Sequence, residues 1–245
     1  MEYLLIFLVG VIGTSIGTLA GGGGFITLPM LLLLGTPIHS AIGVNKVSNT
    51  ISSFSSFFYL FRNKKIKLKE SFWIIPVSLA GGISGSFIAS MLNADYMYII
   101  AIVLLIASFI FSVIRKDWFS GEPRPIPKIL SMLGIYAIGI YNGLFGPGQA
   151  TLMMYFFGFL KVSYIKTIGF VRLASFSSSF GAAVIYILNG HVIWLTAICL
   201  ILGSVTGAQI GVRVAEKLQP KFVKILLQIV TIALIVQIIV QQFSS

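Results

Sequence analysis

The sequence predicts an all-α polytopic membrane protein made of two inverted repeats, and three observations lead to this fold class. The chain is 57% hydrophobic and only 9% charged, with a mean hydropathy of +1.01, whereas about a quarter of the residues of a soluble domain are charged. Long apolar runs alternate with short basic segments. The second half of the chain repeats the order of the first.

The apolar runs of the first half differ in length. Residues 4–19 and 25–34 are short for a membrane span of about 20 residues. They flank GGGG at 21–24, and each glycine in a helix interior costs roughly 1 kcal/mol relative to alanine. We therefore expect two short helices that meet at a glycine break, as a re-entrant hairpin or as two tilted spans. Three full spans follow, at 38–61, 71–92 and 95–114.

The second half has the same order. Short helices are expected at 129–145 and 150–160, on either side of the break FGPGQ at 145–149. Further spans are expected at 164–188, 192–212 and 221–242. The joint between the halves, RKDWFSGEPRPIPK, is too charged and proline-rich for a membrane helix. The predicted organisation is repeat 1 at 1–114, a cytoplasmic linker at 115–128 and repeat 2 at 129–245, in one integrated membrane domain.

A shift of 126 residues aligns the halves without a gap. AIGVNKVSNTISSF (41–54) then matches TIGFVRLASFSSSF (167–180), which pairs Gly43 with Gly169 and Lys46 with Arg172. Glycines earlier in each half also pair at this offset. The match indicates two copies of one structural unit.

Charge predicts the orientation of the two copies. Loop 62–70 has five cations, whereas the equivalent loop 189–191 has none. Because Lys and Arg accumulate in cytoplasmic loops, these two loops are expected on opposite sides, which makes the repeats inverted, as in many secondary transporters. The segments 62–70, 115–128, 158–166 and 213–224 are then cytoplasmic and hold 15 of the 17 Lys and Arg residues.

The two remaining cations are Lys46 and Arg172. Inverted symmetry would bring both towards the middle of the molecule, and all six acidic residues fall at ends or in loops. A buried cation without a carboxylate needs a mobile anion or hydrogen-bonding dipoles as its partner. The simplest candidate is an anionic substrate; the alternative is that each side chain extends to the nearest headgroups.

The glycine breaks predict hydrogen-bond donors for the same ligand. A helix that starts after GGGG, at Phe25, would direct backbone N–H groups into the interior, where an oxyanion could accept them. The alternative is close helix packing, the role that we assign to Gly81, Gly85, Gly207 and Gly211. The candidate substrate-binding residues are Lys46, Arg172, Asn45, Asn49, Gly22, Gly23, Gly24, Gly148, Gln149 and Ser175.

The motifs resemble those of a known family. AGGGGFITLP (20–29), the A-x-G-x-N helix entry at 41–45, the basic loop and the tandem order are similar to the sulfite exporter TauE/SafE family. The second half departs from the family's common glycine-rich copy, with GPGQA at 146–150 in its place. The resemblance implies movement of sulfur-containing anions, such as sulfite and organosulfonates, usually outward across the bacterial inner membrane.

We expect a secondary transporter, an exporter of small sulfur-containing oxyanions that works by alternating access, with a passive anion channel and a structural membrane protein as alternatives. The partners would be a small anionic substrate and the lipid bilayer, without nucleic acid, and a homo-oligomer stays open. We expect no catalytic residue, cofactor or metal site. The two histidines, His39 and His191, lie in separate loops without an acid or cysteine at metal-ligand spacing.

Overall fold

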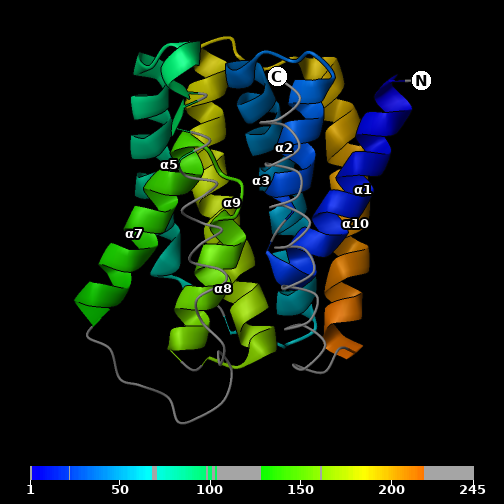
Figure 1. Ribbon diagram of the computed structural model, residues 1–245. Helices are drawn as coiled ribbons and strands as arrows, with labels where there is room; N and C mark the ends of the chain where they lie inside the picture. Colours follow the sequence, from blue (N-terminus) through cyan, green and yellow to red (C-terminus); the bar gives the residue numbers. More distant parts are fainter. Residues whose placement is uncertain are drawn as a thin grey trace.

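The computed structural model describes residues 2–21, 23–67, 71–97, 99–100, 103, 128–160 and 162–217. Within these ranges all the regular elements are helices, so the all-α prediction is confirmed (Figure 1). The first half contains α1 (Glu2–Ala20), α2 (Gly24–Leu33), α3 (Ile38–Arg62) and α5 (Ile74–Met91). The second half contains α7 (Lys128–Leu144), α8 (Gln149–Phe159), α9 (Tyr164–Leu188) and α10 (Trp194–Lys217).

The helix bounds follow the apolar runs closely, with two differences. α1 begins at Glu2 and, like α5, α9 and α10, is long and apolar enough to cross a membrane, so it is not a short helix. α10 continues past 212 to Lys217, because the polar residues that end the apolar run include the good helix formers Arg213 and Glu216. The predicted span 221–242, most of 95–114 and residues 115–127 of the linker lie outside the described residues.

Each half of the chain packs against the other half. α1 lies along α10, and α7 lies along α5, so the first helix of each half contacts a later helix of the other. Glycines allow these close approaches: a Cβ on Gly207 or Gly211 would meet the backbone of α1, and one on Gly81 or Gly85 would meet the backbone of α7. The packing role predicted for these four glycines is confirmed.

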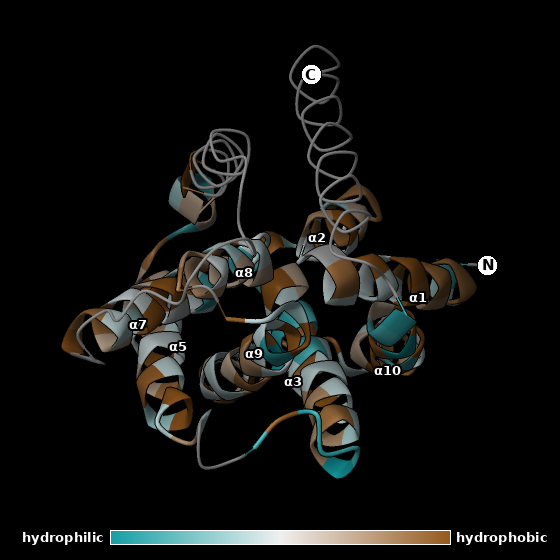
Figure 2. Ribbon diagram, turned by 90° about the horizontal axis from the view of Figure 1, so that it is seen from below, coloured by the Kyte–Doolittle hydropathy of each residue, from teal (hydrophilic) through white to brown (hydrophobic). Residues whose placement is uncertain are grey.

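Helices α3 and α9 form the middle of the molecule. Seen along the bundle, they lie side by side between the α5–α7 pair and the α1–α10 pair (Figure 2). α3 and α9 are equally long, but only α9 is apolar enough to be a span candidate by composition. The polar side chains that lower the hydropathy of α3 therefore lie at the centre of the bundle.

The two helix pairs at the glycine breaks enter from opposite ends. The N terminus and the connection from α2 to α3 lie at one end of the molecule, whereas α7 begins and α8 ends at the other (Figure 1). The breaks meet in the interior: a Cβ on Gly24 would lie 2.9 Å from the Cα of Pro147, and Gly21 faces the backbone of Thr151. Each helix pair therefore turns back at its glycine break in the interior.

Candidate functional site

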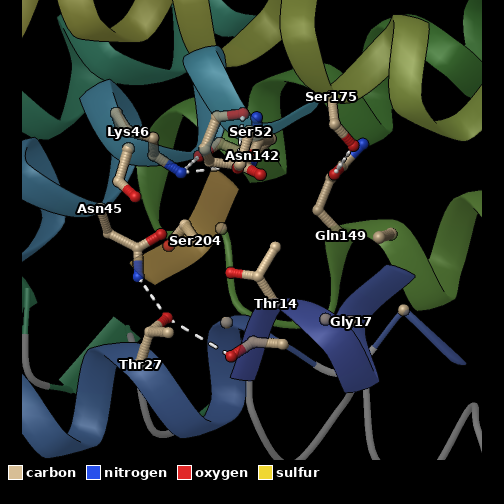
Figure 3. A pocket seen from close by; sticks show the side chains of 18 of the residues that line it. Thr14, Gly17, Thr27, Asn45, Lys46, Ser52, Asn142, Gln149, Ser175 and Ser204 are labelled. Atoms are coloured by element: carbon tan, nitrogen blue, oxygen red, sulfur yellow. Dashed lines mark hydrogen bonds between the residues drawn. The ribbon is translucent and has the colours of Figure 1, made fainter. Parts of the chain in front are cut away.

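A polar cavity lies where the two breaks meet the central helices (Figure 3). Its volume of about 50 Å³ leaves room for several water molecules or one small ion. The polar side chains that line it are Thr14, Thr27, Asn45, Lys46, Ser48, Asn49, Ser52, Asn142, Gln149, Arg172, Ser175 and Ser204.

Lys46 and Arg172 both line this cavity and are 2% and 3% exposed. The ammonium of Lys46 donates to the carbonyl of Asn142, to Asn142 Oδ1 at 3.1 Å and to the carbonyl of Phe145 at 3.2 Å. These acceptors lie at the C-terminal end of α7, where the helix dipole favours a cation. An ammonium has three N–H donors, so Lys46 is fully engaged in holding this helix end.

Arg172, unlike Lys46, has N–H groups without a hydrogen-bond acceptor among the described residues. Its Nη1 lies 3.5 Å from Ser53 Oγ, but its Nε and Nη2 are buried without a hydrogen-bond partner among the described residues. A guanidinium carries five N–H donors in a planar fork that fits an oxyanion. A buried donor without an acceptor costs about 1–3 kcal/mol, more when it is charged. The site is therefore incomplete until an acceptor enters.

Gln149 provides another such donor. Ser175 Oγ donates to Gln149 Oε1 at 2.8 Å, which fixes the side-chain amide (Figure 3). Its Nε2 is buried and has no partner within the described part of the chain. Gln149 begins α8, directly after Gly148, whose φ of 83° is in the left-handed region that glycine adopts at little cost.

The two predicted asparagines are held by the protein itself. Asn45 Nδ2 donates to Thr27 Oγ1 at 2.7 Å and so connects α3 to the start of α2. Asn49 Nδ2 donates to Ser179 Oγ at 2.9 Å, and its Oδ1 accepts from Ser53 Oγ at 2.9 Å. Both line the cavity, but their amides primarily join the helices that surround it.

The predicted glycines lie at the cavity wall where the structure describes them. Gly23, Gly24 and Gly148 line it, and Gly22 lies outside the described residues. α2 begins at Gly24, one residue before the predicted start at Phe25. The N-terminal ends of both short helices, α2 and α8, therefore border the cavity, as expected for a site that offers backbone donors.

Asn142 is a cavity residue that the sequence interpretation missed. It accepts from Lys46 and donates to Ser178 Oγ at 2.7 Å and Ser179 Oγ at 3.1 Å. The repeat comparison gives no signal for it, because the residue 126 positions earlier is Ile16. A lone amide in an apolar run just before the second break is the signal that could have found it.

The charge of the cavity is positive. Among the described residues that line it there is no Asp or Glu, and the described ion pair, Lys65 with Glu216 at 3.7 Å, involves the last turn of α10. His39 and His191 do not line the cavity; their rings stack on each other, with centroids 5.1 Å apart. The cavity chemistry thus favours a small anion that accepts several hydrogen bonds.

Comparisons with known proteins find relatives along nearly the whole chain. The family model "Sulfite exporter TauE/SafE" matches residues 6–238. The "Probable membrane transporter protein ORF9" of Sinorhizobium sp is 30% identical over 96% of this chain and 91% of its own length. YfcA of Escherichia coli (strain K12), also named a probable membrane transporter protein, is 25% identical over 93% of this chain and 86% of its own length. YdhB of Bacillus subtilis (strain 168), which has the same description, is 28% identical over 90% of this chain and 91% of its own length. No solved structure matches the chain. The match over nearly the whole chain shows that this membrane transporter belongs to the sulfite exporter TauE/SafE family.

Proposed function

We propose that this protein is a secondary transporter that exports small sulfur-containing oxyanions, such as sulfite or organosulfonates, across the bacterial inner membrane. The observation that supports this most is that Arg172 and Gln149 both line a cavity without a described carboxylate and both have buried N–H donors without a partner among the described residues. A small oxyanion would accept these hydrogen bonds and neutralise the guanidinium. The family name supports sulfite, and the cavity volume of about 50 Å³ supports a small ligand.

The transport mechanism that we propose is alternating access between inverted repeats. The two helix pairs at the breaks enter from opposite ends and contact each other at Gly24 and Pro147, beside the cavity. Movement of one pair against the other would open the cavity to one side at a time. The basic loops 62–70, 115–128, 158–166 and 213–224 would face the cytoplasm.

A binding screen on the purified protein tests this proposal. Thermal unfolding is measured with sulfite, sulfate, thiosulfate, sulfoacetate, taurine and simple carboxylates, and with sodium and potassium salts of an inert anion. Stabilisation by a sulfur oxyanion that Arg172→Ala abolishes is the expected result. Stabilisation by cations alone would contradict the proposal. Steady current that follows the electrochemical gradient without saturation would instead identify a passive channel.

A further inference from the structure

The cavity contains a second cation, Lys46, whose donors are already used by the protein. Its ammonium already donates to three neutral oxygens, two of them main-chain carbonyls at the end of α7. Those acceptors belong to the second half of the chain, whereas Lys46 is in α3 of the first. The contact therefore holds the two halves together at the break, and its strength depends on the number of N–H groups on Nζ.

A lysine side chain can exist in a protein as a neutral amine, whereas an arginine stays charged. An ammonium supplies three N–H donors and an amine supplies two, so loss of one proton leaves one of the three α7 oxygens without its donor. Arg172, at the matching place in the second half, offers no such change. The two cations are thus chemically different. Arg172 has a fixed charge and donors without a partner among the described residues, whereas Lys46 can release a proton.

A continuous chain of hydrogen bonds connects the two cations. Asn142 accepts from Lys46 and donates to Ser179 Oγ at 3.1 Å. Ser179 Oγ also accepts from Asn49 at 2.9 Å, and Asn49 Oδ1 accepts from Ser53 Oγ at 2.9 Å. Ser53 Oγ accepts from Arg172 Nη1 at 3.5 Å. Amide groups do not pass protons, so this series of hydrogen bonds does not conduct protons. It couples the orientation of the N–H groups of Arg172 to that of the N–H groups of Lys46.

The surroundings of Lys46 contain no described acid that could take its proton. Among the residues that line the cavity, the other titratable side chain is Arg172 on α9. α7 presents Asn142 and, nearby, Tyr141, whose hydroxyl donates to the carbonyl of Pro147. The cavity residues described on α1, α2, α8 and α10 are Gly, Ala, Leu, Thr, Ser or Gln. A proton released by Lys46 would therefore need water in the cavity as its acceptor.

We propose that Lys46 exchanges one proton in each transport cycle, so that the anion and a proton move across the membrane in the same direction. This role rests on the proposed function. With the anion bound, the opposite charge favours the ammonium, and the loaded cavity carries both. After the anion leaves, the Nζ–H bond breaks, the electron pair stays on Nζ, and the proton passes to cavity water on the side of release. The neutral amine then donates to fewer oxygens of α7, and a proton from the side of loading restores the ammonium.

Proton movement in proteoliposomes tests this role. The full-length protein is reconstituted with a pH-sensitive dye inside, the membrane potential is clamped with potassium and valinomycin, and an inward gradient of sulfate or methanesulfonate is applied. Both probes stay fully ionised near neutral pH, so neither brings a proton of its own. Isotope uptake of the same anion is measured in parallel. Acidification of the lumen that accompanies anion uptake is expected, and its loss on addition of a protonophore shows that protons cause the signal.

The variants Lys46→Arg and Lys67→Arg make the test specific. Arginine keeps a cation at position 46, as the chain itself does at Arg172, but it cannot release a proton; the acidification per anion taken up should be lost. Lys67 is exposed in the basic loop 62–70, so Lys67→Arg should acidify like the unchanged protein. Acidification per anion that persists in Lys46→Arg would overturn the role of Lys46.

A measurement on the unchanged protein tests the proton role even if Lys46→Arg fails to fold. A pH gradient alone, at equal anion concentrations, should drive anion accumulation on the alkaline side. Anion uptake without a pH change, or with alkalinisation of the lumen, would overturn the proton role and leave the proposed function standing. Failure to transport sulfate, methanesulfonate and also sulfite would remove the proposed function itself and the role that depends on it.

Discussion

Lys46 and Arg172 occupy matching positions 126 residues apart and line the same cavity, yet their side chains have different partners. The ammonium of Lys46 donates to the carbonyls of Asn142 and Phe145 at the end of α7. The guanidinium of Arg172 contacts Ser53 and keeps Nε and Nη2 without a hydrogen-bond partner among the described residues. This difference assigns structural support to Lys46 and anion binding to Arg172 in the proposed mechanism.

Replacement of Arg172 by methionine should separate binding from stability. Arg172 is a buried cation without a counter-ion among the described residues, and its removal relieves a desolvation cost, so Arg172→Met should unfold at the same temperature as the unchanged protein or higher. Sulfite at about 100 times its Kd should stabilise the unchanged protein by roughly 2.7 kcal/mol, and this gain should vanish in the variant. Thermal unfolding with and without sulfite measures both effects; a variant that is still stabilised by sulfite would exclude Arg172 from the site.

Ser175 positions the amide of Gln149 and should contribute to affinity through it. Loss of the Ser175 hydroxyl removes a donor to Gln149 Oε1, so Ser175→Ala should weaken anion binding by roughly fivefold, or about 1 kcal/mol. Ser177 is a matched control on the same helix, because its hydroxyl donates to the carbonyl of Leu173 and it does not line the cavity. Calorimetric titration of both variants with sulfite checks this; equal loss in Ser177→Ala would indicate a general effect on α9.

Gly146 is required both for its backbone conformation and for the space next to Lys46. Its φ is 103°, and a Cβ there would collide with the ammonium of Lys46. Gly146→Ala should cost about 1–2 kcal/mol for the backbone, and roughly 1–3 kcal/mol more because the ammonium of Lys46 has to leave its acceptors on α7. Gly190 has a φ of 71° with open space around it, so Gly190→Ala should show only the cost of the backbone conformation. Thermal unfolding in detergent measures the stability of both variants. Equal stabilities would contradict the extra cost next to Lys46.

The membrane orientation can be tested with single cysteines. In a Cys199→Ser background, Lys67→Cys should react with an impermeant maleimide only from the cytoplasmic side, and Ala94→Cys only from the outside. Both positions are exposed, and they flank α5, so one candidate span separates them. Labelling of both from one side would show that α5 does not cross the membrane and would remove the inverted topology.

The fold was largely predictable because its signals are local. Apolar run lengths gave the bounds of α9 without error, and the glycine breaks predicted where α1 and α7 end. The repeat predicted that Lys46 and Arg172 would approach each other, and they do line one cavity. α10 runs beyond its apolar segment because helix formation continues through polar residues that hydropathy does not select.

The partners of each side chain were not predictable, because they depend on how the two halves pack. Lys46 appeared unpaired in sequence, but the carbonyls that it contacts belong to residues about a hundred positions later. Main-chain carbonyls leave no trace in a sequence, and Asn142 has no counterpart in the first half. The assignment of binding to Arg172 rather than to Lys46 therefore required the three-dimensional arrangement.

The most direct test of the central claim is to locate a bound anion. Selenate has nearly the size and charge of sulfate, and crystals of the protein soaked in selenate would reveal it by anomalous scattering. A selenium peak is expected in the cavity, with selenate oxygens within hydrogen-bond distance of Arg172 Nη2 and Gln149 Nε2. A peak elsewhere, or a cavity without one at selenate concentrations that stabilise the protein, would contradict it.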